Sequence, residues 1–270
     1  MTPADANGSL PQQDVDAERH WHEQPFFLES DHWTAHPLLV SREQHWLHND
    51  VQTERFYAHL YRYQAAKQQR RDVVVLLAPV GNGRDYYFLQ NVFASMRAVH
   101  GIDLSRHALA VCPRSVETHE GDIVRSGYAD GMFDVVICSQ FLHHVHATGF
   151  APFLSEFHRM LRPGGTLAIL EPGDLHPIWR LAQLARRFMG NVTGLVEGER
   201  PVRPSQVTTA LEKAGFAELQ MHPLLFTHVR LPTALQHLLD AVDYPLRLVP
   251  GVRNFANSFG WYCSKPITSR

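Results

Sequence analysis

Two glycines and one aspartate are the residues of this chain best suited to bind a nucleoside. Gly81 and Gly83 lie in a turn directly after the apolar run Val73–Ala78, and Asp103 ends the next apolar run. Glycines let the backbone approach a ligand closely, and the helix expected after them directs its free N–H groups to the same place. An acid at the end of the neighbouring strand accepts hydrogen bonds from both hydroxyls of a ribose.

This arrangement serves either a dinucleotide or S-adenosylmethionine (SAM). The dinucleotide fingerprint G-x-G-x-x-G needs a third glycine where this chain has Tyr86, whose side chain would hinder the close packing of helix on strand. The phosphate-binding pattern G-x-x-x-x-G-K-[ST] does not occur. The residues therefore favour SAM over a nicotinamide or flavin dinucleotide.

Strands alternate with helices along the chain, which puts these residues at the ends of strands. Short apolar runs predict strands at 73–78, 98–103, 133–138, 166–170, 217–221 and 258–263. Apolar stripes at helical spacing predict helices at 51–67, 88–96, 105–111, 150–161 and 205–214. Such alternation implies parallel pairing with right-handed crossovers. We expect an α/β fold with a doubly wound, seven-stranded, Rossmann-like sheet.

The amino-acid composition limits the kinds of partner and the compartment that we expect for this protein. The 270 residues carry 25 Lys and Arg against 27 Asp and Glu, so no global positive charge attracts nucleic acid or an anionic membrane. The three cysteines lie far apart without a CxxC pair, which suits a reducing compartment. Neither a signal peptide nor a long apolar span is apparent. These features predict a cytoplasmic protein without nucleic-acid or membrane partners.

The segments outside the alternation predict the domain organisation. Residues 1–17 are polar and are expected to form a disordered tail. Residues 18–70 are rich in aromatic residues and histidine, and we expect them to form a helical N-terminal lid. The remainder, 71–270, is the predicted cofactor-binding domain, with insertions at about 173–203 and 223–256 that would shape a substrate site.

The 18 histidines raise the question of a metal site. Several lie in close pairs, but no HExxH or Cys/His array accompanies them, which favours a histidine-rich surface and no metal. His143 and His144 follow a predicted strand; because adjacent side chains point apart, we expect only one of them to reach the site. His144 is the candidate catalytic base, with His36 and His48 as further candidates.

Five segments resemble, in the usual order, the class I SAM-dependent methyltransferases, especially the bacterial small-molecule group. They are residues 77–83, 101–105, 120–123, 133–145 and 161–166. The resemblance covers about 72–172 and runs more loosely to 266. In the first segment Leu77 replaces the family's acid and Pro79 its first glycine. The resemblance implies a site for SAM, with S-adenosylhomocysteine as product.

The resemblance also implies roles by position. Gly81 and Gly83 would line the methionine and ribose, Asp103 the ribose hydroxyls, Asp122 the adenine. Ser139 and Gln140 would border the methionine tail and the methyl group. The full set of implied cofactor-binding residues is Pro79, Gly81, Gly83, Asp103, Leu104, Asp122, Ile123, Ser139 and Gln140. Two alternatives stay open: Asp103 as a plain helix cap, and Asp122 as a residue of a surface turn.

The activity implied is methyl transfer to an O, N, S or C nucleophile of a small molecule, such as a specialised metabolite. An alternative is a SAM-binding protein of the same fold that does not methylate: a cyclase, or a regulatory or scaffold subunit. A methyltransferase acting on nucleic acid is disfavoured by the neutral charge balance.

Overall fold

The computed structural model describes residues 42–146, 148–181, 184, 200–228, 231 and 233–267, and side chains from residue 51 on. The predicted tail at 1–17, the candidate base His36 and most of the first half of the predicted lid lie outside the described residues. So do residues 182–199, apart from 184, of the first predicted insertion. His48 lies in a described helix, but its side chain does not belong to the described part.

The centre of the fold is one seven-stranded sheet with the strand order β3-β2-β1-β4-β5-β7-β6. Its strands are β1 (Val73–Leu77), β2 (Met96–Asp103), β3 (Glu117–Glu120), β4 (Phe133–Ser139), β5 (Leu161–Pro172), β6 (Ala217–Leu225) and β7 (Ser258–Ser264). The helices are α3 (Arg42–Ala66), α4 (Asp85–Val92), α5 (Arg106–Ala110), α6 (Ala151–Met160), α8 (Pro204–Lys213) and α9 (Thr233–Leu248), with short 3-10 turns η1 (Ile123–Arg125) and η2 (Val252–Phe255). The predicted seven-stranded, doubly wound sheet is confirmed.

Strand direction differs from the expectation of parallel pairing at one place. The strands β1 to β5 pair in parallel, whereas β7 runs antiparallel to both β5 and β6. Every residue of β7 is buried, as in a parallel strand covered on both faces. Because burial of both faces gives the same apolar run in either direction, the sequence pattern does not distinguish the two.

Among the further differences from the predicted elements are one helix end and one strand. The helix expected to run to Met96 ends at Val92, because Phe93 is already extended, and Met96 begins β2. The strand β3 was not predicted, since its four residues, Glu117–Glu120, are all exposed and carry no apolar pattern. It forms the edge of the sheet through backbone pairing with β2 alone.

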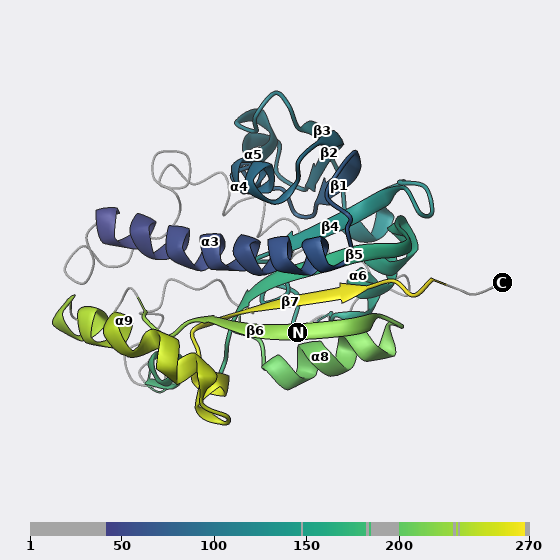
Figure 1. Cartoon of the computed structure of the whole chain (residues 1–270). Helices are drawn as coiled ribbons and strands as arrows, with labels where there is room; N and C mark the ends of the chain where they lie inside the picture. The colour runs from purple at the N-terminus through teal and green to yellow at the C-terminus, as the bar shows by residue number, and fades with distance from the viewer. Residues whose placement is uncertain are drawn as a thin grey trace.

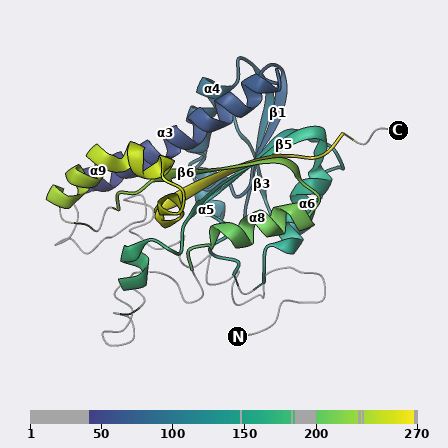
Figure 2. The ribbon, with the colours of Figure 1, turned by 60° about the horizontal axis from the view of Figure 1, so that its bottom comes forward.

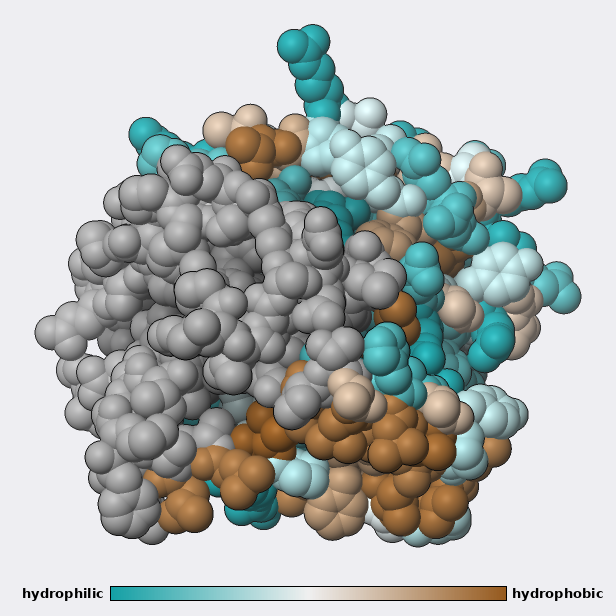
Figure 3. All heavy atoms as spheres, turned by 90° about the vertical axis from the view of Figure 1, so that its left-hand side faces the viewer, coloured by the Kyte–Doolittle hydropathy of each residue, from teal (hydrophilic) through white to brown (hydrophobic). Residues whose placement is uncertain are grey.

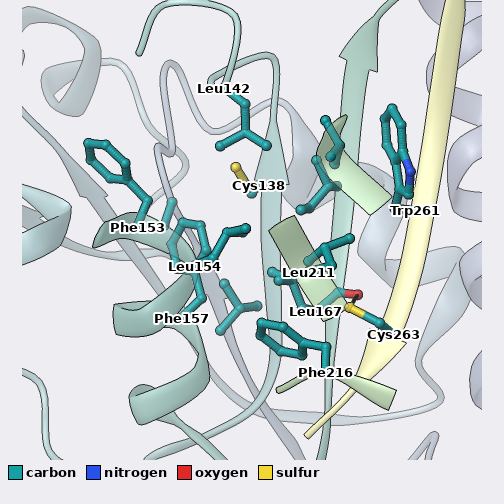
Figure 4. Close-up of a cluster of buried hydrophobic side chains, with 14 of the residues drawn as sticks. Cys138, Leu142, Phe153, Leu154, Phe157, Leu167, Leu211, Phe216, Trp261 and Cys263 are labelled. Carbon is teal, nitrogen blue, oxygen red and sulfur yellow. Dashed lines mark hydrogen bonds between the residues drawn. The ribbon is translucent and has the colours of Figure 1, made fainter. Parts of the chain in front are cut away.

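Helices cover both faces of the sheet, α3 and α4 on one and α6 and α8 on the other (Figure 2). Two cores result, because successive strand residues point to opposite faces: along β1, Val74 and Leu76 join one core, and Val75 and Leu77 the other. Figure 4 shows the α6 and α8 side. Its labelled residues are Cys138, Leu142, Phe153, Leu154, Phe157, Leu167, Leu211, Phe216, Trp261 and Cys263.

The helix predicted at 51–67 exists and begins earlier, at Arg42 (Figure 1). Its predicted apolar stripe is buried: Phe56 and Leu60 are fully enclosed and Tyr63 is 5% exposed. The helix is tied to β7 by the Tyr262 hydroxyl, which donates to the Phe56 carbonyl at 2.8 Å. The described part of the predicted lid therefore packs on a sheet face, and its role as a lid remains a prediction.

The second predicted insertion, 223–256, contains α9, which packs beside β6. Its buried side chains are polar: Asp243 is 1% exposed and accepts hydrogen bonds from the Phe226 N–H and from Arg55. Large apolar side chains of α9 are exposed, and Figure 3 shows apolar surface gathered at the low part of the face where α9 lies. They are Leu235, Leu238, Val242 and Leu248.

Candidate cofactor site

The strand order brings four separate turns together at one edge of the sheet. Because β3, β2, β1 and β4 are parallel neighbours, their carboxyl ends lie side by side. All the predicted cofactor-binding residues lie in the turns that follow these four strands or at the strand ends themselves. The structure thus brings together residues that are up to 61 positions apart in the chain, from Pro79 to Gln140. Their individual contacts with a cofactor stay predictions.

The two glycines of the turn after β1 differ in the space around their Cα atoms. Gly83 has φ +75°, and a Cβ there would lie 2.5 Å from Pro113 Cδ, so this position requires glycine for steric reasons within the protein. Gly81 has φ +52°, but a Cβ there would meet nothing within 4 Å. The space in front of Gly81 is open, which fits the close approach of a ligand to the backbone.

Asp103 is buried and connects two of the turns. One carboxylate oxygen accepts a hydrogen bond from the Gly81 N–H at 2.9 Å, and the other accepts one from the Ser105 N–H at 2.9 Å. The cap of α5 is Ser105, whose hydroxyl accepts from the Ala108 N–H at 3.2 Å, so Asp103 is not the helix cap of the alternative reading. A buried carboxylate at the end of this strand fits hydrogen bonds from ribose hydroxyls.

The turn after β3 holds the predicted adenine residues. The Asp122 carboxylate caps η1 by accepting the Val124 N–H at 2.9 Å, and Ile123 is 5% exposed. Leu104, in the neighbouring turn after β2, is partly exposed. An apolar side chain beside a capped carboxylate is a suitable surface for a base, and the role of Asp122 in binding adenine stays a prediction beside its capping role.

A buried carboxylate that the sequence analysis did not single out shapes the turn after β4. Glu171, near the end of β5, is fully enclosed. It accepts hydrogen bonds from the backbone N–H groups of Phe141, at 2.7 Å, and Leu142, and its second oxygen lies 2.7 Å from His143 Nδ1. The available signal in the sequence was an acid directly after the apolar residues 167–170. Glu171 and His143 hold in place the turn that begins with Gln140, whose N–H donates to the Leu170 carbonyl at 2.8 Å.

The two adjacent histidines lie differently from the expectation. Their ring centroids are 4.0 Å apart, because residues 142–144 form a turn and not a strand, so adjacent side chains do not point apart. His143 is buried against Glu171, whereas His144 is partly exposed. His144 remains the candidate base by prediction. Within the described part of the chain, no group of three or more His, Cys, Asp or Glu side chains is arranged to hold a metal ion.

Leu77 occupies the position where the family that the sequence resembles has an acid. The first acid after it in the chain is Asp85. Leu77 is 1% exposed and packs in the apolar core under α3, so β1 offers no acid to the site. Asp85, partly exposed, opens α4 directly after the glycine turn. Burial raises its pKa to about 6, while Tyr57 from α3, Arg84 and Ser139 at the end of β4 act in the opposite direction. Three elements thus converge on this carboxyl group.

Comparisons of the sequence with known proteins agree with this geometry. Residues 78–169 match the family described as "Methyltransferase domain". An uncharacterized protein of Escherichia coli (strain K12) is 35% identical over 119 residues, which are 39% of this chain and 56% of that protein. A demethylmenaquinone methyltransferase of Chlorobaculum parvum is 28% identical over 148 residues, 47% of this chain and 60% of that protein. The chain therefore spans a little over half the length of the curated relatives it matches.

The fold has solved counterparts as well. A SAM-dependent methyltransferase of Thermotoga maritima, described as a possible histamine N-methyltransferase, is 18% identical, with a TM-score of 0.54 over 79% of this chain and 91% of that one. At this identity the likeness concerns the fold. The chain thus contains a segment, 78–169, that matches the methyltransferase-domain family, within a sheet that has the fold of a solved SAM-dependent methyltransferase.

Proposed function

We propose that this protein transfers a methyl group from SAM to an O, N, S or C nucleophile of a small molecule. The observation that carries the proposal is the contact between Asp103 and the Gly81 N–H, which unites an open glycine turn with a buried acid at the sheet edge. The similarity to a demethylmenaquinone methyltransferase supports a small-molecule acceptor. No described helix is long and apolar enough to cross a membrane.

The residues divide the binding task by position. Asp103 would accept the ribose hydroxyls, Asp122 and Ile123 would hold the adenine, and Ser139 with Gln140 would border the methionine tail. The remaining turn residues, Pro79, Gly81, Gly83 and Leu104, would form the backbone and apolar surface beneath the cofactor. The SAM sulfonium supplies an already activated methyl group when bound. The protein's share of the chemistry is then to align the acceptor with that group and to exclude water.

A proton acceptor is required only if the acceptor atom carries a proton at neutral pH, as a hydroxyl or an ammonium does. His144 is the residue we propose for that step, because it is partly exposed in the turn after β4, beside the proposed methyl site. Figure 3 shows exposed apolar surface at the low part of the face where α9 lies, and this surface favours an acceptor with an apolar part.

The first prediction concerns cofactor binding and transfer. Isothermal titration should give about micromolar dissociation constants for SAM and for S-adenosylhomocysteine, since both carry the nucleoside that the turns are proposed to bind. Isotopically labelled SAM should then transfer its methyl group to a small acceptor in an extract of metabolites. Folded protein that binds neither ligand would contradict the assignment. Binding without transfer to any acceptor would favour the non-methylating alternative, a cyclase or a regulatory subunit.

The second prediction tests the lid. Deletion of residues 1–41 should leave binding of S-adenosylhomocysteine intact and abolish turnover, because the aromatic residues of this segment are proposed to enclose the acceptor. Deletion of residues 1–17 is the control and should leave both unchanged. The cut stops before α3, since Phe56 and Leu60 of that helix belong to the core and their loss would unfold the protein. Normal methylation by the longer deletion would show that this segment is not a lid.

A further inference from the structure

Because β1 has no acid at its end, the proposed cofactor site lacks the usual negative charge that would face the ammonium group of SAM. The methionine tail of SAM ends in a carboxylate and an ammonium group, and a cation is bound best by an ionised acid with few competing partners. The position where the family has an acid holds Leu77, which is 1% exposed within the apolar core. To compensate the positive charge of the ammonium group, an acid from another element must then face it.

Asp85 is the acid that the fold places nearest to this role. It is the first residue of α4, two positions after Gly83, and it remains partly exposed. The Ser139 hydroxyl, at the end of β4, hydrogen bonds with it and lowers its pKa. Asp85 therefore lies between the glycine turn and the residue proposed to border the methionine tail.

Tyr57 closes the opposite side of Asp85. Its ring stacks on Phe88 of α4, with ring centroids 5.4 Å apart, and is 3% exposed. Its buried hydroxyl lies close enough to Asp85 for each to shift the other's pKa, yet among the described residues it makes no hydrogen bond of standard geometry. A buried hydroxyl without a partner is costly, and it points to a polar group of a ligand beside Asp85.

We propose that Asp85, with the hydroxyl groups of Tyr57 and Ser139, binds the ammonium group of the cofactor's methionine tail. Asp85 would thus replace the acid that the family has at the position of Leu77. This inference rests on the proposed function, because it assigns one group of the same cofactor. The ionised Asp85 carboxylate accepts N–H bonds from the ammonium, and the hydroxyls complete its hydrogen bonding.

The charge state of Asp85 makes the proposal dependent on pH. Burial raises the pKa of Asp85 to about 6 in the unliganded protein, while the nearby Tyr57 hydroxyl, the charge of Arg84 and the Ser139 hydroxyl act in the opposite direction. Above this value the carboxylate is ionised and attracts a cation; below it the protonated form does not. Affinity for a ligand with an ammonium group should therefore fall by about tenfold between pH 7 and pH 5, in proportion to the ionised fraction.

The test compares two ligands that differ in the tail. S-adenosylhomocysteine carries the ammonium group, whereas 5′-methylthioadenosine keeps the adenine, ribose and sulfur but has no amino-acid tail. By titration calorimetry, Asp85→Asn should weaken S-adenosylhomocysteine about tenfold, as expected for loss of a charge-assisted bond, and leave methylthioadenosine unchanged. Asp130→Asn, at a side chain that is 80% exposed, is the matched control and should change neither affinity.

Each outcome decides between the proposals. Equal affinity of Asp85→Asn and parent for S-adenosylhomocysteine overturns the inference, and so does an equal loss for both ligands, which would mean a structural role. If the parent binds neither ligand, it is the proposed function that fails. Should Asp85→Asn not fold, Tyr57→Phe, which keeps the ring stacking, takes its place in the same comparison. The parent protein offers a second measurement, the ratio of its affinities for S-adenosylhomocysteine and methylthioadenosine as a function of pH. A ratio that stays constant from pH 7 to pH 5 overturns the proposal.

Discussion

Replacement of Glu171 by alanine should lower the free energy of unfolding by about 3 kcal/mol or more, because each buried hydrogen-bond donor left without an acceptor costs about 1–3 kcal/mol. The carboxylate is fully enclosed, and its loss would leave His143 Nδ1 and the N–H groups of Phe141 and Leu142 without their acceptor. Urea denaturation followed by circular dichroism measures the change. The same variant should bind S-adenosylhomocysteine more weakly, because this turn directly follows Ser139 and Gln140.

Two further variants separate burial from charge in this prediction. Glu218→Ala removes a carboxylate whose side chain is 63% exposed and pairs with Lys67, so it should cost less than about 1 kcal/mol. Glu171→Gln keeps the shape but presents an N–H₂ group to backbone donors, and it should fall between the parent and Glu171→Ala. A change below about 1 kcal/mol for Glu171→Ala would show that the turn after β4 holds its conformation without this carboxylate.

Asp103→Ala should weaken binding of S-adenosylhomocysteine and of methylthioadenosine alike, by tenfold or more. A charge-assisted hydrogen bond contributes roughly 1.5–3 kcal/mol, and every 1.4 kcal/mol or so is a factor of ten in affinity. Both ligands carry the ribose that Asp103 is proposed to bind, so the loss must not depend on the methionine tail. This equal loss distinguishes Asp103 from Asp85, whose replacement should affect only the ligand with the tail. Calorimetry with the same pair of ligands measures both.

The structure adds an effect on stability to this prediction. The Asp103 carboxylate accepts the N–H groups of Gly81 and Ser105, so alanine leaves two donors unpaired and should also lower the thermal midpoint. Ser105→Ala, which removes the cap of α5 but keeps Asp103, is the matched control: it should cost about 1 kcal/mol of stability and little affinity. Unchanged binding by Asp103→Ala would remove Asp103 from the proposed site.

The sheet and the position of the site followed from local signals in the sequence. Apolar runs such as Val73–Leu77 identify strands because each residue of a strand covered on both faces must be apolar. Gly83, which adopts φ +75° in the turn after β1, and Ser105, the cap of α5, follow conformational and hydrogen-bonding preferences of their own residue types in local turns. Alternation of such elements then implied the strand ends at which Gly81 and Asp103 meet.

What only the tertiary structure decided depends on partners far away in the chain. The antiparallel direction of β7, the exposed strand β3 and the contact of Glu171 with His143 across 28 residues leave no local pattern. The same holds for Asp85, which became a candidate for the missing acid only when α3 brought Tyr57 and β4 brought Ser139 to it. Burial by these partners sets its pKa and its hydrogen bonding, because desolvation and hydrogen bonds depend on distance in space and not on spacing in sequence.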